Sequence, residues 1–272
     1  MTLAARKISG PQPTTAETLE QPGSAEQLLP ACISKSKSRM DLWVELIRAL
    51  GTRRMAEIGV YRGDFASEVL QSCAGLTAYY MIDPWRHLND WNKPANHDDA
   101  MLEEFFREAK RKTDFAAAKR IILRGKTTEV IDQISDADLD LAYIDADHTL
   151  KGIAIDLIRV YPKVRAGGFV GGDDFTNSIW EHNSAFEPTL VFPFAVYFAE
   201  AVGATIYALP YSQFCLHKNA CPRFSFVDLT GQYRDVGLRG QLAPQRLLNT
   251  ALRERFPRLM RAARKTRNRI FG

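Results

Sequence analysis

The sequence predicts an α/β fold with a doubly wound, mostly parallel sheet and helices on both faces. Three observations lead to this prediction. Short apolar runs alternate with helical patterns from about residue 40 to residue 217. This alternation is typical of βαβ units, whose crossovers are right-handed. The last two apolar runs are separated only by Pro210, Tyr211 and Ser212, too few residues for a parallel crossover, so they should form an antiparallel hairpin.

Each short apolar run is expected to form a strand. The five parallel strands are expected at residues 55–60, 78–82, 120–123, 139–144 and 168–172, and the two strands of the hairpin at 205–209 and 213–217. The expected helices show apolar residues at 3–4 spacing. The first begins near Met40 and stops at Gly51, and the others cover residues 65–72, 99–112, 128–134, 149–160 and 194–202. The clearest stripe is that of helix 149–160: Leu150, Ile153, Ala154, Leu157, Ile158 and Tyr161.

The 272 residues divide into three parts. Residues 1–38 are rich in Pro, Ser, Thr, Gly and Gln and are predicted to be a flexible N-terminal arm. Residues 39–235 form the main domain, and residues 236–272 a basic helical tail. Nine Lys or Arg and one acid give the segment 240–272 a charge of +8, whereas the rest of the chain is about −4.

Three interpretations of the basic tail remain open. It can be a helix packed on the domain or on a second subunit, as in a homo-oligomer. It can attach to an anionic membrane surface. It can also contact nucleic acid. A nucleic acid partner is disfavoured, because no RNA-binding module accompanies the tail and aromatic residues are sparse in it.

The remaining composition is that of a soluble cytoplasmic protein, with 46% hydrophobic and 25% charged residues. The four cysteines form no CxxC pair and are expected to be reduced thiols. No signal peptide is apparent. The segment 189–216 carries a single charge, Glu200, but Pro193, Gly203 and Pro210 interrupt it. A buried helix followed by two core strands explains it better than a membrane span.

A candidate nucleotide site begins after the first strand, in the segment Glu57–Phe65. Gly59 permits a tight turn, and Gly63 permits close approach of the backbone to a ligand or to the next helix. Asp83 ends the second strand twenty residues after Gly63, where a carboxylate can accept hydrogen bonds from the hydroxyls of a ribose. A glycine-bearing turn without a ligand, and a capping role for Asp83, remain alternatives.

NAD and S-adenosylmethionine both fit this pattern. A pyrophosphate needs the close backbone of GxGxxG at a helix N-terminus. Here the middle glycine is missing, and Tyr61 stands near its place. S-adenosylmethionine has no phosphate, so its loop need only curve around an amino acid. Tyr61 and the wider gap therefore favour S-adenosylmethionine.

From about Met40 to Lys218, the chain resembles class I S-adenosylmethionine-dependent methyltransferases, and especially methyltransferase family 24, whose relatives include macrolide-sugar and, more remotely, catechol O-methyltransferases. The resemblance rests on residues 57–63, 82–85, 143–148 and 171–175. It implies a Rossmann-like seven-stranded sheet with a reversed last strand. It also implies cofactor contacts from Glu57, Gly59, Tyr61, Gly63, Asp83, Trp85, Thr127 and Asp145.

Acidic residues close the fourth and fifth strands: Asp145 and Asp147, then Asp173 and Asp174. Adjacent parallel strands lie about 4.8 Å apart. Asp145, Asp173 and Asp174 can therefore converge at one rim, where crowded carboxylates suit Mg²⁺. The resemblance points the same way. Four acids without a metal, with one of each pair capping a helix, remain an alternative.

The sequence therefore predicts metal-assisted O-methylation of a small hydroxylated molecule, such as a sugar or secondary metabolite. Mg²⁺ would lower the pKa of the acceptor hydroxyl, and His148, three residues after Asp145, would be the general base. A structural role for His148 stays open. The alternatives are a metal-free O- or N-methyltransferase, a nucleotide-dependent oxidoreductase, and a non-catalytic scaffold. The loop 85–98, with two tryptophans, is expected to be a lid.

Overall fold

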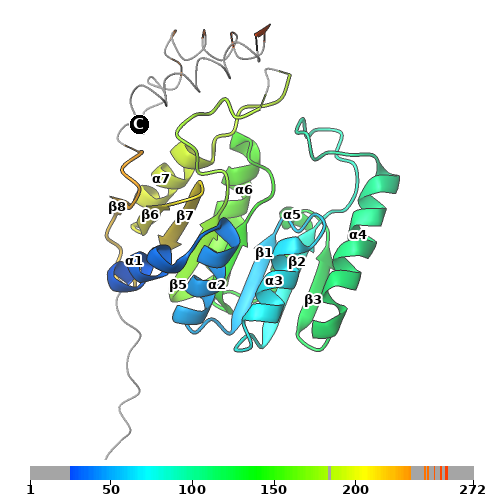
Figure 1. Cartoon of the computed structure of the whole chain (residues 1–272), viewed down its shortest axis with the longest axis horizontal. Coiled ribbons are helices and arrows are strands. Elements are labelled where there is room, and N and C mark those ends of the chain that lie inside the picture. Colours follow the sequence, from blue (N-terminus) through cyan, green and yellow to red (C-terminus); the bar gives the residue numbers. More distant parts are fainter. Residues whose placement is uncertain are drawn as a thin grey trace, which may run out of the picture.

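The computed structural model describes residues 25–182 and 185–233, and six isolated positions between 242 and 256. The described chain forms one eight-stranded sheet with helices on both faces (Figure 1). The strand order is β3-β2-β1-β4-β5-β7-β6-β8. The strands are β1 (Arg54–Ile58), β2 (Ala78–Asp83), β3 (Arg120–Arg124), β4 (Leu139–Ile144), β5 (Val164–Gly172), β6 (Thr205–Leu209), β7 (Gln213–His217) and β8 (Ser225–Asp228). The predicted α/β class and the seven predicted strands are confirmed.

The reversed end of the sheet is also confirmed. Strand β7 lies antiparallel between β5 and β6. The β6–β7 hairpin turns through Tyr211 and Ser212, which both have positive φ values, 62° and 58°. The eighth strand was not predicted. β8 is a four-residue edge strand that pairs in parallel with β6, and its residues are at most half-buried. A strand this short and exposed has no apolar run from which it could be predicted.

The helices are α1 (Ala25–Lys35), α2 (Arg39–Ala49), α3 (Asp64–Ser72), α4 (Asp99–Thr113), α5 (Thr127–Val130), α6 (Leu150–Val160) and α7 (Val191–Val202). Helix α1 corrects the predicted arm, because regular structure begins at Ala25 and not near Met40. Leu29 and Cys32 of α1 are buried against the domain. These apolar contacts outweigh the composition of the surrounding segment and Pro30 inside the helix. Residues 1–24 and almost all of the predicted tail 236–272 lie outside the described residues.

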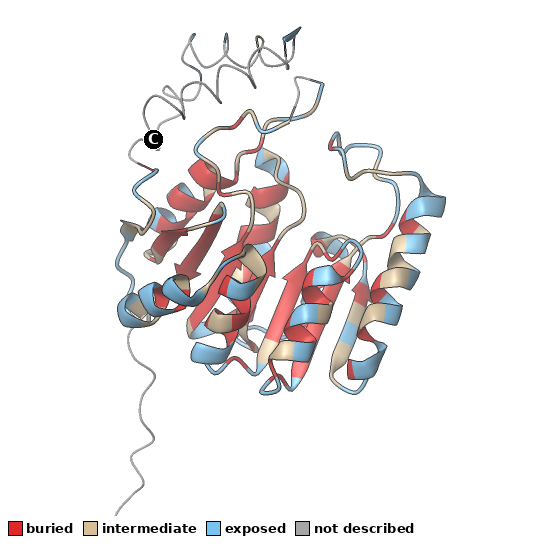
Figure 2. Cartoon of the chain, viewed as in Figure 1, coloured by how far each residue is buried: buried red, intermediate tan, exposed pale blue. Residues whose placement is uncertain are grey.

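Each face of the sheet buries its own apolar cluster. One cluster joins the strands to α5, α6 and α7, and the other joins them to α1, α2, α3 and α4. Figure 2 shows the central strands buried, while the edge strands β3 and β8 are partly exposed and the helices expose their outer faces. The segment 189–216 forms α7, β6 and β7, as predicted. Among the described helices, none is both long and apolar enough to cross a membrane.

Candidate active site

A cavity of about 490 Å³ opens at the carboxyl ends of β1, β2 and β4. Parallel sheets bind ligands at this end, near the point where the strand order reverses. In this sheet β1 has its chain-order successor β2 on one side and β4 on the other, so the reversal lies at β1. The loops that follow these strands line the cavity, together with the segment 84–95 and the first turns of α6.

Gly59 fixes the join between the first loop and β4. Its φ of +88° lies in the left-handed region, and a Cβ at this position would overlap the backbone carbonyl of Asp145. The neighbouring backbones are further held together by a hydrogen bond from the Asp145 N–H to the Ile58 carbonyl, 2.8 Å long. The loop at Gly59 can therefore approach β4 only because no side chain stands there.

Gly63 allows close approach to a helix, one of the two kinds of approach expected for it. It precedes α3 with a φ of +76°, and a Cβ there would lie 2.8 Å from the Cα of Ala109 in α4. Gly63 thus permits close packing of α3 on α4, and it is not among the residues that line the cavity. Tyr61 does line it, with a φ of 52°, and its ring packs against Phe105 at 4.6 Å between centroids.

Asp83 organises the loop opposite it. One carboxylate oxygen accepts the N–H groups of Val60 and Tyr61, both at 2.9 Å, and the other accepts that of Trp85 at 2.8 Å. Burial raises the pKa of Asp83 above its ordinary value, although these three hydrogen bonds favour the charged form. The buried indole of Trp85 donates to the Tyr61 carbonyl at 2.7 Å. A carboxylate offers about four acceptor positions, so Asp83 keeps one for a ligand hydroxyl.

Glu57 lies on β1, below this loop. Its side chain is 1% exposed and accepts a hydrogen bond from the Tyr79 hydroxyl at 2.8 Å. Burial raises the pKa of Glu57 well above its ordinary range, and the charges of Asp145 and Asp83 add to the effect. A cationic ligand group beside Glu57 would stabilise its charged form.

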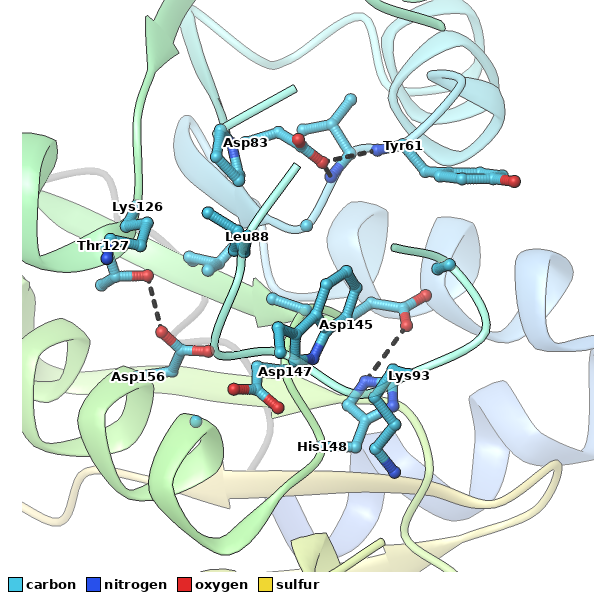
Figure 3. A pocket seen from close by; sticks show the side chains of 18 of the residues that line it. Tyr61, Asp83, Leu88, Lys93, Lys126, Thr127, Asp145, Asp147, His148 and Asp156 are labelled. Atoms are coloured by element: carbon cyan, nitrogen blue, oxygen red, sulfur yellow. Dashed lines mark hydrogen bonds and ion pairs between the residues drawn. The ribbon is translucent and has the colours of Figure 1, made fainter. Parts of the chain in front are cut away.

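Thr127 lies at the other end of the cavity, where its hydroxyl donates to Asp156 of α6 at 2.6 Å (Figure 3). Burial raises the pKa of Asp156 to about 7, although the hydrogen bond from Thr127 acts in the opposite direction. The sequence analysis missed Asp156. The predicted stripe of α6 included Leu150 and Ile158, which are more than half exposed, whereas Asp156 is 4% exposed. Its spacing from Ile153 and Val160 places it on the buried face and could have revealed it.

The three acids predicted to converge do converge. Strands β4 and β5 pair up to Ile144 and Gly172, so Asp145 and Asp173 follow at adjacent strand tips. Arg39 of α2 bridges them. Its Nη1 lies 3.1 Å from Asp145 Oδ2 and also forms an ion pair with Asp173. Asp173 is further held by Gln213 Nε2 and by the N–H of Asp174.

His148 completes this cluster. Its Nδ1 forms an ion pair with Asp174, and its Nε2 lies 3.5 Å from Asp145 Oδ1 (Figure 3). Burial alone would lower the pKa of His148, but the hydrogen bonds and charges of Asp145 and Asp174 outweigh it and raise the pKa to about 10. This direction favours the imidazolium form of His148 in the ligand-free protein, and its role as the general base stays a prediction.

The predicted Mg²⁺ ligands do not fit a metal in this arrangement. Five of the six carboxylate oxygens of Asp145, Asp173 and Asp174 already face Arg39, His148 or a hydrogen-bond donor, so a cation could bind these acids together only by displacing those groups. Within residues 25–182 and 185–233, no group of three or more His, Cys, Asp or Glu side chains is arranged to hold a metal ion. Asp147 instead accepts the N–H of Thr149, at the start of α6.

Residues of the segment 85–98 line the cavity, and a role of this segment as a lid stays a prediction. Asn96 ties its two ends together through hydrogen bonds with both backbone groups of Leu88, at 3.0 and 2.8 Å. Lys93 is 6% exposed and donates to Thr189 at 3.1 Å, which joins this segment to the one before α7. Burial lowers the pKa of Lys93. His182 also lines the cavity on this side.

Comparison with known proteins gave a family match and several similar structures. Residues 56–175 match the model of a methyltransferase domain. Similar structures include a candidate caffeoyl-CoA O-methyltransferase from Staphylococcus aureus (17% identity, 66% of this chain and 82% of that one, TM-score 0.49). The O-methyltransferase TomG from Streptomyces achromogenes, in complex with SAM, is 16% identical over 67% and 80% (TM-score 0.47). An O-methyltransferase from Bacillus cereus, in complex with SAH, is 15% identical over 71% and 88% (TM-score 0.47). The search of curated proteins returned no match.

Proposed function

Since residues 56–175 form a methyltransferase domain, we propose that the chain transfers the methyl group of S-adenosylmethionine to a hydroxyl oxygen of a small acceptor. The observation that carries this proposal is the position of two groups on one cavity. Asp83, which suits a ribose hydroxyl, and the Asp145–His148 cluster both line it. A nucleoside held at Asp83 would thus present its sulfonium to a cluster of acids.

The cofactor would lie across the carboxyl ends of β1, β2 and β4. Asp83 would accept a ribose hydroxyl, and Glu57 would face the cationic methionine end, where its negative charge is favoured. Thr127 and Asp156 would border the adenine. Asp156 takes up a proton near neutral pH, so it can either donate to or accept from a purine edge. The loop at Tyr61 lacks the close backbone that a pyrophosphate requires, which favours S-adenosylmethionine over NAD.

Methyl transfer is an in-line displacement. The acceptor oxygen forms a bond to the methyl carbon while the carbon–sulfur bond breaks, and the electron pair of that bond stays on sulfur as a neutral thioether. The oxygen becomes a protonated ether, a strong acid, so even a carboxylate can remove its proton. We assign this proton to Asp145. His148, whose ring contacts both Asp145 and Asp174, would hold Asp145 in place and, as an imidazolium, add a positive charge beside it.

The acceptor would enter beside the lid segment, between Lys93 and His182. The cavity is limited to about 490 Å³ and is lined on one side by residues of the segment 85–98. A volume of this order holds a cofactor together with a small molecule but not a folded macromolecule. This supports a small hydroxylated acceptor, such as a sugar or a secondary metabolite.

The test is methyl transfer itself. The purified chain is incubated with S-adenosylmethionine and a panel of sugars, phenols and aliphatic alcohols, with amines of matched size as a parallel panel. Mass spectrometry follows S-adenosylhomocysteine and methylated products. A product methylated on oxygen supports the proposal. Products methylated only on nitrogen would overturn the assignment of the acceptor atom, and no transfer to any hydroxyl would overturn the reaction.

A further inference from the structure

The guanidinium of Arg39 stands where neighbouring strand tips bring two carboxylates together. Arg39 is the first residue of α2, after the cap Ser38, whose side chain accepts the N–H of Asp41. The helix start is thus fixed, and one nitrogen, Nη1, pairs with both Asp145 and Asp173. A single cationic atom shared between carboxylates of adjacent strands is the arrangement that a divalent cation would otherwise adopt.

The carboxylates under Arg39 are held by donors that cannot easily leave. Gln213 is fully buried and fixes Asp173. Its own carbonyl oxygen accepts from the Trp43 indole at 2.8 Å and from the Tyr143 hydroxyl at 3.1 Å. The Asp174 N–H occupies the same oxygen of Asp173 that Gln213 does. Among the residues that the structure describes, the other oxygen of Asp173, Oδ2, contacts only Arg39.

The carboxylates are also paired without a metal. Asp145 and Asp173 both contact Arg39, and Asp174 contacts the ring of His148. A divalent cation placed beside Arg39 would be repelled by it at contact distance in a partly buried site. Arg39 is 40% exposed in its side chain and lines the cavity, so its outward face is accessible to a ligand.

We propose that Arg39 takes the place of a divalent cation between Asp145 and Asp173, so that the chain binds no metal at this rim and its methyl transfer is metal-independent. Only the statement about methyl transfer rests on the proposed function; the statement about metal binding does not. Arg39 lies outside the four segments that carry the resemblance and before the matched residues 56–175, so neither takes account of it. Its role follows from the contacts across the fold.

The test measures the binding of Mn²⁺ alone. Binding is monitored through the electron paramagnetic resonance signal of the free ion. Five proteins are compared: wild type, Asp173→Asn, Arg39→Met, Arg39→Met with Asp173→Asn, and Arg48→Met as a control on the same helix. Arg48 donates to the Ser72 carbonyl, away from the rim. Calorimetry with S-adenosylhomocysteine shows whether each variant keeps its cofactor site.

We expect no Asp173-dependent Mn²⁺ binding in wild type or Arg48→Met. Arg39→Met should bind Mn²⁺ about tenfold or more tightly than wild type, and Asp173→Asn should abolish this gain. Wild-type binding that is lost on Asp173→Asn would overturn the proposal, and so would an Arg39→Met protein that stays silent. If wild type fails to bind S-adenosylhomocysteine, the proposed function falls, while the Mn²⁺ comparison still decides the place of Arg39.

Discussion

Gly59 and the carbonyl of Asp145 touch so closely that a methyl group on Gly59 would overlap that oxygen. This contact joins the cofactor loop after β1 to the acid at the tip of β4. Contacts between backbone atoms therefore fix the two halves of the cavity relative to each other. The same contacts set the distance between the side chains of Asp83 and Asp145.

Gly59→Ala should lower both stability and cofactor affinity. A non-glycine residue with positive φ costs about 1–2 kcal/mol, and the overlap with Asp145 adds about 1–3 kcal/mol. Gly51→Ala is the matched control, because Gly51 has a φ of +61° but nothing within 4 Å of the added Cβ. Denaturant unfolding should show the larger loss for Gly59→Ala. An equal loss of unfolding free energy in the two variants would mean that the backbone at Asp145 moves aside at no cost, and would contradict the prediction.

Asp83→Asn should weaken binding of S-adenosylhomocysteine by about tenfold or more, because hydrogen bonds to a charged acceptor contribute about 1.5–3 kcal/mol each. The amide would also turn an N–H group toward the loop. Asp228→Asn is the control. Asp228 accepts the N–H groups of Thr230, Gly231 and Tyr233 in the same manner, beyond β8. Calorimetry should show a loss for Asp83→Asn and normal affinity for Asp228→Asn.

Asp156→Asn should change how stability depends on pH. An acid whose native pKa, here about 7, exceeds its unfolded value binds more protons when folded. The free energy of unfolding therefore falls as pH rises from about 4 to about 7. At 1.36 kcal/mol per pKa unit, the loss by pH 8 is of order 4 kcal/mol. Asn keeps an acceptor for Thr127 but does not titrate. In unfolding experiments, the variant should match wild type at pH 4 and exceed it at pH 8; parallel curves would refute this.

His148→Gln should reduce turnover far more than cofactor binding. Glutamine can contact Asp174 but cannot carry a charge, so Asp145 loses its contact with the histidine ring and keeps only Arg39 as a cationic partner. Loss of a group that assists proton transfer typically costs about 10²–10⁴-fold in rate. Once an acceptor is known, kcat should fall by about this factor, while the Kd for S-adenosylhomocysteine changes little. A fall in affinity with kcat preserved would assign His148 to binding alone.

Much of this site could be predicted, because strand tips are visible in sequence. The apolar runs that end at Ile82, Ile144 and Gly172 place Asp83, Asp145 and Asp173 on one rim, and the structure confirms that the acids of β4 and β5 meet there. Carboxylate crowding was thus predictable, and the need for a cation followed from it.

The identity of that cation was not predictable. Arg39 lies 106 positions before Asp145, and no periodicity links a helix start to a strand tip so far along the chain. The charge state of His148 depends on Asp174 and Asp145 together, which only the folded arrangement brings to both of its nitrogens. Strand β8 escaped notice because an edge strand of four residues needs little apolar surface.

The central claim is that the cavity between Asp83 and Asp145 receives S-adenosylmethionine. Calorimetric titration of the wild-type chain with S-adenosylhomocysteine, beside the same titration with NADH, tests it most directly. The account predicts one S-adenosylhomocysteine bound per chain and no measurable binding of NADH. Saturable binding of NADH without binding of S-adenosylhomocysteine would contradict it.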